Sequence, residues 1–402
     1  MKVLISSYTP HGKSSYGIMT RLVWTELLKK GGYDVVQHGW FDGQNKLNIP
    51  WQVIPTKKNI YDNTISPVAS DKFGAESFES IVAKFRPDIV WCLSDLYMSS
   101  YIDKYKKKYK YRIVRWTLSE SENINTDFAP NVINSDECVF MTELAAKAWK
   151  KITNKDYPVI GYPIDTQIFT PVNAERKAVL RSEASGGVIK PEDTVLLYVG
   201  ANQRRKHPWL PFAVTAALKQ IVKQDIWLWM HSPKKADAYD YDKLQRLYGL
   251  QGRVITTPGL SNDNGPAYED MHEVYNISDM LLALSGAEGF CAPLAEAAAC
   301  NIPAVTVNYS GQGEVGRVLN HILIPYHSIQ PAEISCAGIA VPEHKVAISK
   351  IADWIHRGKP PIANHRDLVL KTYDKDIVVD RWDTILKSVY NKEKENYIGE
   401  LI

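Results

Sequence analysis

The stretch MLLALSGAEGFCAPLAEAAACNIP, residues 280–303, combines an apolar run, a glycine-containing loop and a helical pattern. The run from Met280 to Ser285 is short and apolar, as is typical of a buried strand. A helix is expected to begin at Pro293, because proline lacks an N–H group and is favoured in the first helical turn. Strands that pass into helices in this way form parallel α/β sheets.

This stretch also carries the most informative side chains. Glu288 lies in the loop, and Glu296 lies one turn inside the predicted helix. Backbone N–H groups at a helix start bind anions, and carboxylates accept hydrogen bonds from hydroxyl groups. A sugar nucleotide presents both phosphate and hydroxyl groups. The alternative is structural, since two glutamates near a helix start can simply offset the macrodipole.

Alternating strand and helix patterns occur in two series along the chain. Strands are predicted at 3–7, 34–40, 89–94, 112–118 and 137–141, and again at 194–200, 226–231, 254–258, 280–285 and 304–308. Helices are predicted between them, at 17–30, 76–85, 98–107 and 143–151 in the first series. Two such series predict an α/β protein with two doubly wound, Rossmann-like domains that face each other across a cleft.

The domain boundary is predicted at a proline-punctuated hinge, Gly161–Pro171. We expect an N-terminal domain over residues 1–170 and a C-terminal domain over 171–376. A flexible segment is expected at 182–190. Apolar residues at helical spacing predict a last helix near 377–392, and the segment 377–402 is expected to return to the N-terminal domain.

Composition excludes several classes of protein. The chain has 402 residues, more than one core usually organises, and its net charge of +3 is too small to indicate nucleic-acid binding. Its five cysteines include no C-x-x-C pair, so a reducing compartment is favoured over a disulfide framework. The N-terminus starts directly as a strand with no signal peptide, so a cytoplasmic protein is expected.

Four segments, in order, resemble the GT-B-fold retaining glycosyltransferases of family 4, the glycosyl transferases group 1 type. They are Ser14–Gly17 with Lys30–Val35, Gly161–Pro171, Tyr198–Lys206 and Glu288–Glu296. The last is similar to the family's E-G-F-G-x-x-x-x-E pattern. The resemblance implies transfer of a hexose from a nucleoside diphosphate sugar to a hydroxyl group. It also implies that the N-terminal domain, 1–170, is the acceptor-side domain and that the C-terminal domain, 171–376, binds the nucleotide sugar.

The resemblance also implies roles for individual residues. Lys206 stands at the family's phosphate lysine, but Ala201 replaces the arginine that often follows the glycine, so Arg205 or Arg204 has to supply that charge. Cations there would stabilise the leaving diphosphate. Without the neighbouring motifs, an ordinary solvated basic turn would be the favoured interpretation of these residues.

The remaining candidates divide between donor and acceptor. Glu288 is implied to contact the transferred hexose and Glu296 the ribose. Further donor contacts are expected from Gly17, Gly289, Phe290 and Cys291, where Cys291 replaces the family's usual glycine. A histidine found in many relatives is missing near Arg115–Glu122, so Glu120, His11 and Tyr16 are the acceptor-side candidates.

No metal site and no cofactor are expected beyond the nucleotide sugar as co-substrate. Two D-x-D patterns, Asp240–Asp242 and Asp374–Asp376, stand in polar helical contexts typical of solvated surfaces. The lysine- and tyrosine-rich segment Tyr101–Arg112 is either a membrane-contacting patch for anionic lipid or a solvated helix end. The expected partners are a nucleotide sugar donor and a glycan or lipid-linked acceptor, without nucleic acid. An anionic membrane is a further partner only under the first interpretation of the basic segment.

The predicted function is retaining, metal-independent hexosyl transfer, with GDP-mannose and UDP-hexose as alternative donors. Two other functions remain open. One is a sugar-nucleotide epimerase on the same fold. The other is a catalytically degenerate module that binds nucleotide sugar or glycan, a reading to which Ala201 and Cys291 give some weight.

Overall fold

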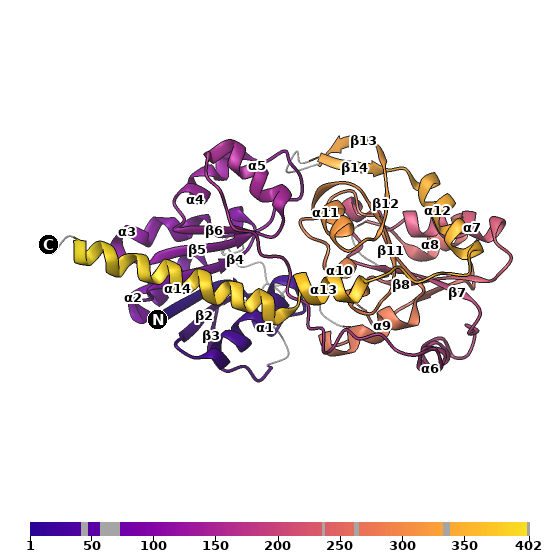
Figure 1. Cartoon of the computed structure of the whole chain (residues 1–402), viewed down its shortest axis with the longest axis horizontal. Coiled ribbons are helices and arrows are strands. Elements are labelled where there is room, and N and C mark those ends of the chain that lie inside the picture. Colours follow the sequence, from indigo (N-terminus) through magenta and orange to yellow (C-terminus); the bar gives the residue numbers. More distant parts are fainter. Residues whose placement is uncertain (42–46, 57–72, 235–237, 261–264, 333–337, 400–402) are drawn as a thin grey trace, which may run out of the picture. The chain divides into compact units, whose positions relative to one another are not determined.

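A computed structural model describes residues 1–41, 47–56, 73–234, 238–260, 265–332 and 338–399, with side chains to residue 392 (Figure 1). The chain divides into two compact units. The first contains Met1–Ser119, Ile124–Pro163 and Lys375–Ile402, and the second contains Glu120–Asn123 and Ile164–Asp374. One passage between them, at Pro163–Ile164, falls inside the predicted hinge Gly161–Pro171.

The first unit is built on a six-stranded parallel sheet of order β3-β2-β1-β4-β5-β6. Its strands are β1 (Lys2–Tyr8), β2 (Asp34–Trp40), β3 (Gln52–Pro55), β4 (Ile89–Leu93), β5 (Arg112–Thr117) and β6 (Glu137–Phe140). Its helices are α1 (Ser15–Lys30), α2 (Ala75–Phe85), α3 (Lys106–Tyr109), α4 (Ala129–Ile133), α5 (Glu143–Thr153) and α14 (Lys375–Gly399). This strand order is that of a doubly wound dinucleotide-binding fold, as predicted.

The C-terminal helix α14 completes the first unit, as the yellow helix in Figure 1 shows. Trp382 of α14 is fully buried, with its ring 5.5 Å from that of Trp91 in β4 and 5.0 Å from that of Trp116 in β5. Lys30 of α1 forms an ion pair of 2.6 Å with Asp380. The two ends of the sequence are therefore parts of one hydrophobic core.

The second unit repeats the architecture, with parallel strands in the order β12-β11-β10-β7-β8-β9. These are β7 (Thr194–Val199), β8 (Ile226–His231), β9 (Val254–Thr256), β10 (Met280–Ala283), β11 (Ala304–Val307) and β12 (Ile322–Ile324). Its helices are α6 (Ala174–Ser185), α7 (Leu210–Ile221), α8 (Tyr241–Leu247), α9 (Met271–Ile277), α10 (Ala292–Ala299), α11 (Ser310–Val318), α12 (His344–His356) and α13 (His365–Thr372). An antiparallel pair, β13 (Tyr326–Pro331) and β14 (Gly338–Pro342), is added to it.

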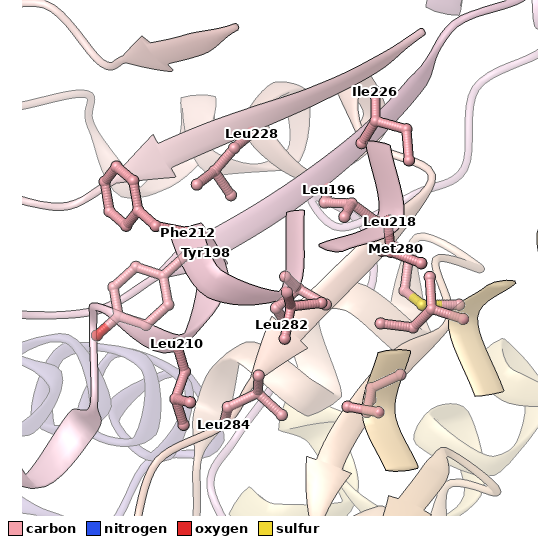
Figure 2. Close-up of a cluster of buried hydrophobic side chains, with 14 of the residues drawn as sticks. Leu196, Tyr198, Leu210, Phe212, Leu218, Ile226, Leu228, Met280, Leu282 and Leu284 are labelled. Atoms are coloured by element: carbon pink, nitrogen blue, oxygen red, sulfur yellow. The ribbon is translucent and has the colours of Figure 1, made fainter. Parts of the chain in front are cut away.

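Apolar strands of this second sheet form a continuous core (Figure 2). Leu196 and Tyr198 of β7 pack there with Leu282 of β10 and with Leu210 and Phe212 of α7. All five side chains are at most 2% exposed. Because both faces of these strands are covered, their sequences are nearly uniformly apolar. These apolar runs allowed the strands to be predicted from the sequence.

Three predictions of local structure were wrong or incomplete. The predicted helix at 98–107 is instead mostly 3-10 turns, Leu96–Met98 and Ser100–Tyr105, before α3. The Ser99 carbonyl accepts hydrogen bonds from the N–H of Ile102 and from the buried guanidinium of Arg115, which favours 3-10 geometry. The segment expected to be flexible, 182–190, contains the last turn of α6 and the buried Ile189. The short strands β3, β12, β13 and β14 were not predicted.

Candidate functional site

The loops that carry the predicted donor residues follow two neighbouring strands. β7 is followed by a 3-10 turn over Arg204–Lys206, and β10 is followed by the turn that leads into α10. β7 and β10 are paired at the centre of the sheet, where the strand order reverses. Ligands of doubly wound folds bind at this switch point, beyond the carboxyl ends of the strands.

Two cations and two carboxylates form one cluster there. Glu288 accepts from Lys206, with Oε1 2.6 Å from Nζ, and its Oε2 is 3.1 Å from an Arg205 guanidinium nitrogen. The other terminal nitrogen of Arg205 is 3.0 Å from Oε1 of Glu120. Arg205 also donates to the Ala287 carbonyl and therefore ties the turn to the 3-10 segment.

The charge state of Glu288 follows from these contacts. Burial alone would raise the pKa of its carboxyl group, but Lys206 and Arg205 outweigh that effect and lower the pKa to about 2. The group is therefore ionised at neutral pH, although its side chain is only 10% exposed. An ionised carboxylate accepts hydrogen bonds and donates none, which suits a residue that would bind sugar hydroxyl groups.

The turn itself is held by neighbouring backbone. The N–H of Gly286 donates to the Arg205 carbonyl at 2.8 Å, and the Gly286 carbonyl accepts from Ala340 of β14 at 2.9 Å. A methyl group on Gly286 would lie 2.3 Å from Ile339 and 2.7 Å from the His207 ring. Only glycine fits at this position. The close packing around Gly286 therefore determines the position of the turn and, with it, that of Glu288.

Helix α11 supports the other side of the turn. The N–H of Glu288 donates to the Ser310 hydroxyl at 3.0 Å, and the N–H of Gly311 donates to the Glu288 carbonyl at 2.9 Å. Ser310 has a φ of 52°, which is unusual for a residue with a side chain. Sequence analysis missed this support, although the glycine-rich segment after β11 resembles the turn after β10 and offered a signal.

Glu296 is buried on α10 in a different environment. Its Oε2 accepts from the Tyr275 hydroxyl at 2.5 Å, and burial raises the pKa of Glu296 to about 7 despite that bond. Glu296 is therefore partly protonated at neutral pH, unlike Glu288. Tyr275, which comes from α9, is a second residue that sequence analysis missed, because nothing in its spacing links it to Glu296.

Cys291 occupies the N-cap position of α10 in the left-handed conformation, with a φ of 76°. Glycine adopts this conformation readily, whereas a residue with a Cβ atom is strained there by about 1–2 kcal/mol. Burial and the nearby Glu288 raise the pKa of the thiol to about 12. Cys291 is therefore a neutral thiol and is unsuited to act as a nucleophile.

The structure assigns the predicted residues to different units. Arg204, Arg205, Lys206, Glu288 to Cys291 and Glu296 all belong to the second unit, together with Glu120. Gly289 and Phe290 are in the turn, where Phe290 packs edge-on against Tyr373 with ring centres 5.0 Å apart. Arg204 is exposed.

His11, Tyr16 and Gly17 belong to the first unit. A methyl group on Gly17 would lie 2.4 Å from the Thr9 carbonyl oxygen. Close packing therefore explains why glycine occupies this position, without any contact to substrate. Tyr16 donates to Asp95 at 2.8 Å, and His11 accepts from the N–H of Leu47 at 3.1 Å. Their predicted contacts with substrate stay predictions.

The acidic pairs and the basic segment have identifiable contacts. Asp240 caps α8 by accepting from the N–H groups of Asp242 and Lys243, and Asp374 accepts from Thr166. Within the described residues, no three His, Cys, Asp or Glu side chains are grouped as a metal site would require. In Tyr101–Arg112, Lys106 pairs with Asp136 and Lys108 with Glu79. The described part of the chain contains no helix with the length and apolarity needed to span a membrane.

Two kinds of comparison relate this chain to known proteins. Residues 182–329 match the family model "Glycosyl transferases group 1". Sucrose-phosphate synthase from Thermosynechococcus elongatus has a similar structure, with a TM-score of 0.74, 15% identity and coverage of 97% of this chain and 99% of that one. The chain therefore has a GT-B fold, and its residues 182–329 match the glycosyl transferases group 1 family.

Other solved structures are similar at comparable distance. Anabaena HepE, in complex with UDP and glucose, has a TM-score of 0.69 at 14% identity and covers 96% of this chain and 100% of its own. The lipopolysaccharide outer core galactosyltransferase WaaB has a TM-score of 0.62 at 17% identity, with 96% and 99% covered. No curated protein sequence matches the chain.

Proposed function

We propose that this protein transfers a hexose, with retention of anomeric configuration and without a metal ion, from a nucleoside diphosphate sugar to a hydroxyl group. The observation that carries the proposal is the cluster of Lys206, Arg205 and Glu288 at the start of α10. It brings two cations, a carboxylate and a helix N-terminus together at the switch point of the second sheet. Phosphate and sugar hydroxyl groups need these partners side by side.

The cations account for the chemical step. Negative charge grows on the diphosphate as the glycosidic bond breaks, and fixed positive charge stabilises it most in the transition state. Lys206 supplies a point charge, and Arg205 supplies a planar fork of N–H donors. Glu288 would keep its ion pairs and accept hydrogen bonds from hexose hydroxyl groups through its remaining lone pairs.

Retention needs no protein nucleophile in this proposal. The acceptor hydroxyl attacks from the face that the diphosphate leaves, and its proton passes to a phosphate oxygen of the leaving group. Glu288 is bound by cations and Glu296 by Tyr275, so neither is placed as the nucleophile of a retaining glycosidase. The neutral thiol of Cys291 is equally unsuited to that role.

UDP-hexose is the favoured donor, with GDP-mannose as the alternative. Support comes from HepE, whose structures contain UDP with glucose and UDP-glucose. The proposed acceptor is a hydroxyl group of a glycan or lipid-linked saccharide, consistent with the galactosyltransferase among the similar structures.

Release of nucleoside diphosphate from UDP-hexoses and GDP-mannose, with and without a panel of glycan acceptors and EDTA, tests the proposal. Acceptor-dependent release unaffected by EDTA is expected, with an unchanged anomeric configuration in the product by NMR. Lys206→Ala should lower kcat by about 10²–10³-fold, the range seen when one donor to a developing oxyanion is removed.

Lys223→Ala is the matched control, because Lys223 is an exposed lysine of the same unit and should keep full activity. Nucleotide binding without turnover on any acceptor would instead favour the degenerate binding module. Isomerisation of the donor without an acceptor would favour the epimerase.

A further inference from the structure

Glu120 faces the same guanidinium that the proposed function assigns to the donor phosphates. It lies in a short irregular segment after β5, and this segment, Glu120–Asn123, groups with the second unit. Its Oε1 is 3.0 Å from a terminal nitrogen of Arg205. Within the segment, the Ser121 hydroxyl donates to the Asn123 carbonyl at 3.0 Å and accepts from the N–H of Asn123 at 3.1 Å, so the segment forms a hydrogen-bonded turn.

The two terminal nitrogens of Arg205 face different partners. One contacts Oε2 of Glu288 and the Ala287 carbonyl, which are parts of the turn. The other contacts Glu120. The guanidinium is therefore anchored through one nitrogen and offers its second nitrogen to an anion, in a fork that matches carboxylate and phosphate oxygens equally well.

The charge of the cluster is balanced in this state. Arg205 and Lys206 oppose Glu288 and Glu120, so the four side chains carry no net charge. An anionic diphosphate gains little by approaching a neutral cluster. Binding it requires that one carboxylate leave, and each carboxylate that leaves restores one unit of positive charge.

Of the two carboxylates, Glu120 costs less to displace. Its side chain is 34% exposed, whereas that of Glu288 is 10% exposed. Glu288 is also fixed by the backbone bonds of its turn to Ser310 and Gly311. A carboxylate that is already partly hydrated regains its remaining solvation easily when it turns away.

We propose that Glu120 is a positioning residue that substitutes for the donor phosphate. It holds Arg205 in its binding geometry while the site is empty, and the diphosphate displaces it from the second guanidinium nitrogen. This inference rests on the proposed function. It assigns Glu120 a role on the donor side, in place of the acceptor contact that the sequence indicated.

Titration calorimetry of UDP and GDP at low ionic strength, on wild type and on Glu120→Gln, tests the inference. The variant keeps the size and one acceptor oxygen but removes the competing charge. The nucleoside diphosphate that binds wild type should bind the variant roughly two- to fivefold more tightly, the range of a partly exposed ion pair. The corresponding nucleoside, which lacks phosphate, should bind both proteins equally.

Glu122→Gln is the matched control, because it removes the same charge from an exposed neighbour in the same segment. It should leave the affinity for the nucleoside diphosphate close to that of wild type, and Glu120→Ala should repeat the gain. Unchanged or weaker binding in both Glu120 variants, with normal binding by wild type, would overturn this inference alone. Failure of wild type to bind any nucleotide would overturn the proposed function as well.

Discussion

At the scale of single residues, the two glutamates of the motif are chemically different. Glu288 is ionised because two cations outweigh its burial, with a pKa lowered to about 2. Glu296 accepts from the neutral Tyr275 hydroxyl group at 2.5 Å, and burial raises its pKa to about 7. Their spacing in the sequence does not distinguish them. Their environments do, because Glu288 stays ionised at neutral pH whereas Glu296 is partly protonated.

The pKa of Glu296 predicts pH-dependent nucleotide binding. The hydroxyl groups of a ribose donate hydrogen bonds and therefore bind the ionised form of Glu296. At pH values below 7, nucleotide binding should release a proton from the Glu296 carboxyl group. Affinity for UDP, or for GDP if that is the donor nucleotide, should rise about tenfold between pH 6 and pH 8 and then level off. Calorimetry across this range measures both the affinity and the proton release.

Glu296→Gln separates this effect from titration of the phosphate itself. The amide oxygen can still accept from Tyr275, but the side chain no longer titrates. The variant should bind more weakly by about 1–3 kcal/mol at pH 8 and should lose the part of the pH dependence that belongs to Glu296. Identical pH profiles for both proteins would remove Glu296 from the nucleotide site.

At the scale of elements, α11 determines where the donor turn lies. A methyl group on Gly311 would lie 2.3 Å from the Gly289 carbonyl oxygen and 2.8 Å from that of Glu288. Gly311→Ala should therefore push the turn away from α11 and weaken nucleotide binding at least tenfold, as well as lower the melting temperature. Calorimetry and thermal unfolding together measure the two effects.

Gly316→Ala on the same helix is the control. Its methyl group would lie 2.7 Å from Thr306 and 2.8 Å from Leu323, away from the donor turn. A comparable loss of thermal stability is expected, but nucleotide affinity should stay near that of wild type. Equal losses of affinity in both variants would mean that α11 acts on the site only through general stability.

At the scale of the whole molecule, the first unit depends on the last helix of the chain. Trp382 packs against Trp91 and Trp116 in the core of that unit. Trp382→Ala should lower the free energy of unfolding by about 3–5 kcal/mol, because it removes a large buried side chain. Urea unfolding followed by circular dichroism measures the change.

Lys387→Ala changes the same helix at a side chain that is 57% exposed, and it should cost little. If Trp382→Ala cost less than about 1 kcal/mol, α14 would not be part of the core that the structure describes. A large loss of unfolding free energy would show that the first unit depends on packing of α14 against the strands of its sheet.

The sequence by itself determined that the chain forms two doubly wound parallel sheets, but not the order of their strands. Long apolar strands that are buried on both faces can be predicted from the sequence, because their hydrophobic pattern is local and strong. Short or half-exposed strands such as β3 and β13 were missed, since only their pairing partners make them strands. Glu288, Glu296 and Lys206 could be named as candidates because strand-to-helix turns mark the carboxyl edge of such a sheet and because the ordered motifs resemble those of a known family.

Only the tertiary structure decided the partners and charges of these residues. The contacts of Glu120 with Arg205, Tyr275 with Glu296, and Ser310 with the donor turn join segments that are distant in the sequence. Burial and neighbouring charge set the protonation of each carboxyl group, and both are properties of folded packing. A sequence pattern can therefore indicate which residues are candidates for the chemistry. Their ionisation, and the competition of Glu120 with phosphate for Arg205, depend on the neighbours that each side chain has in the folded protein.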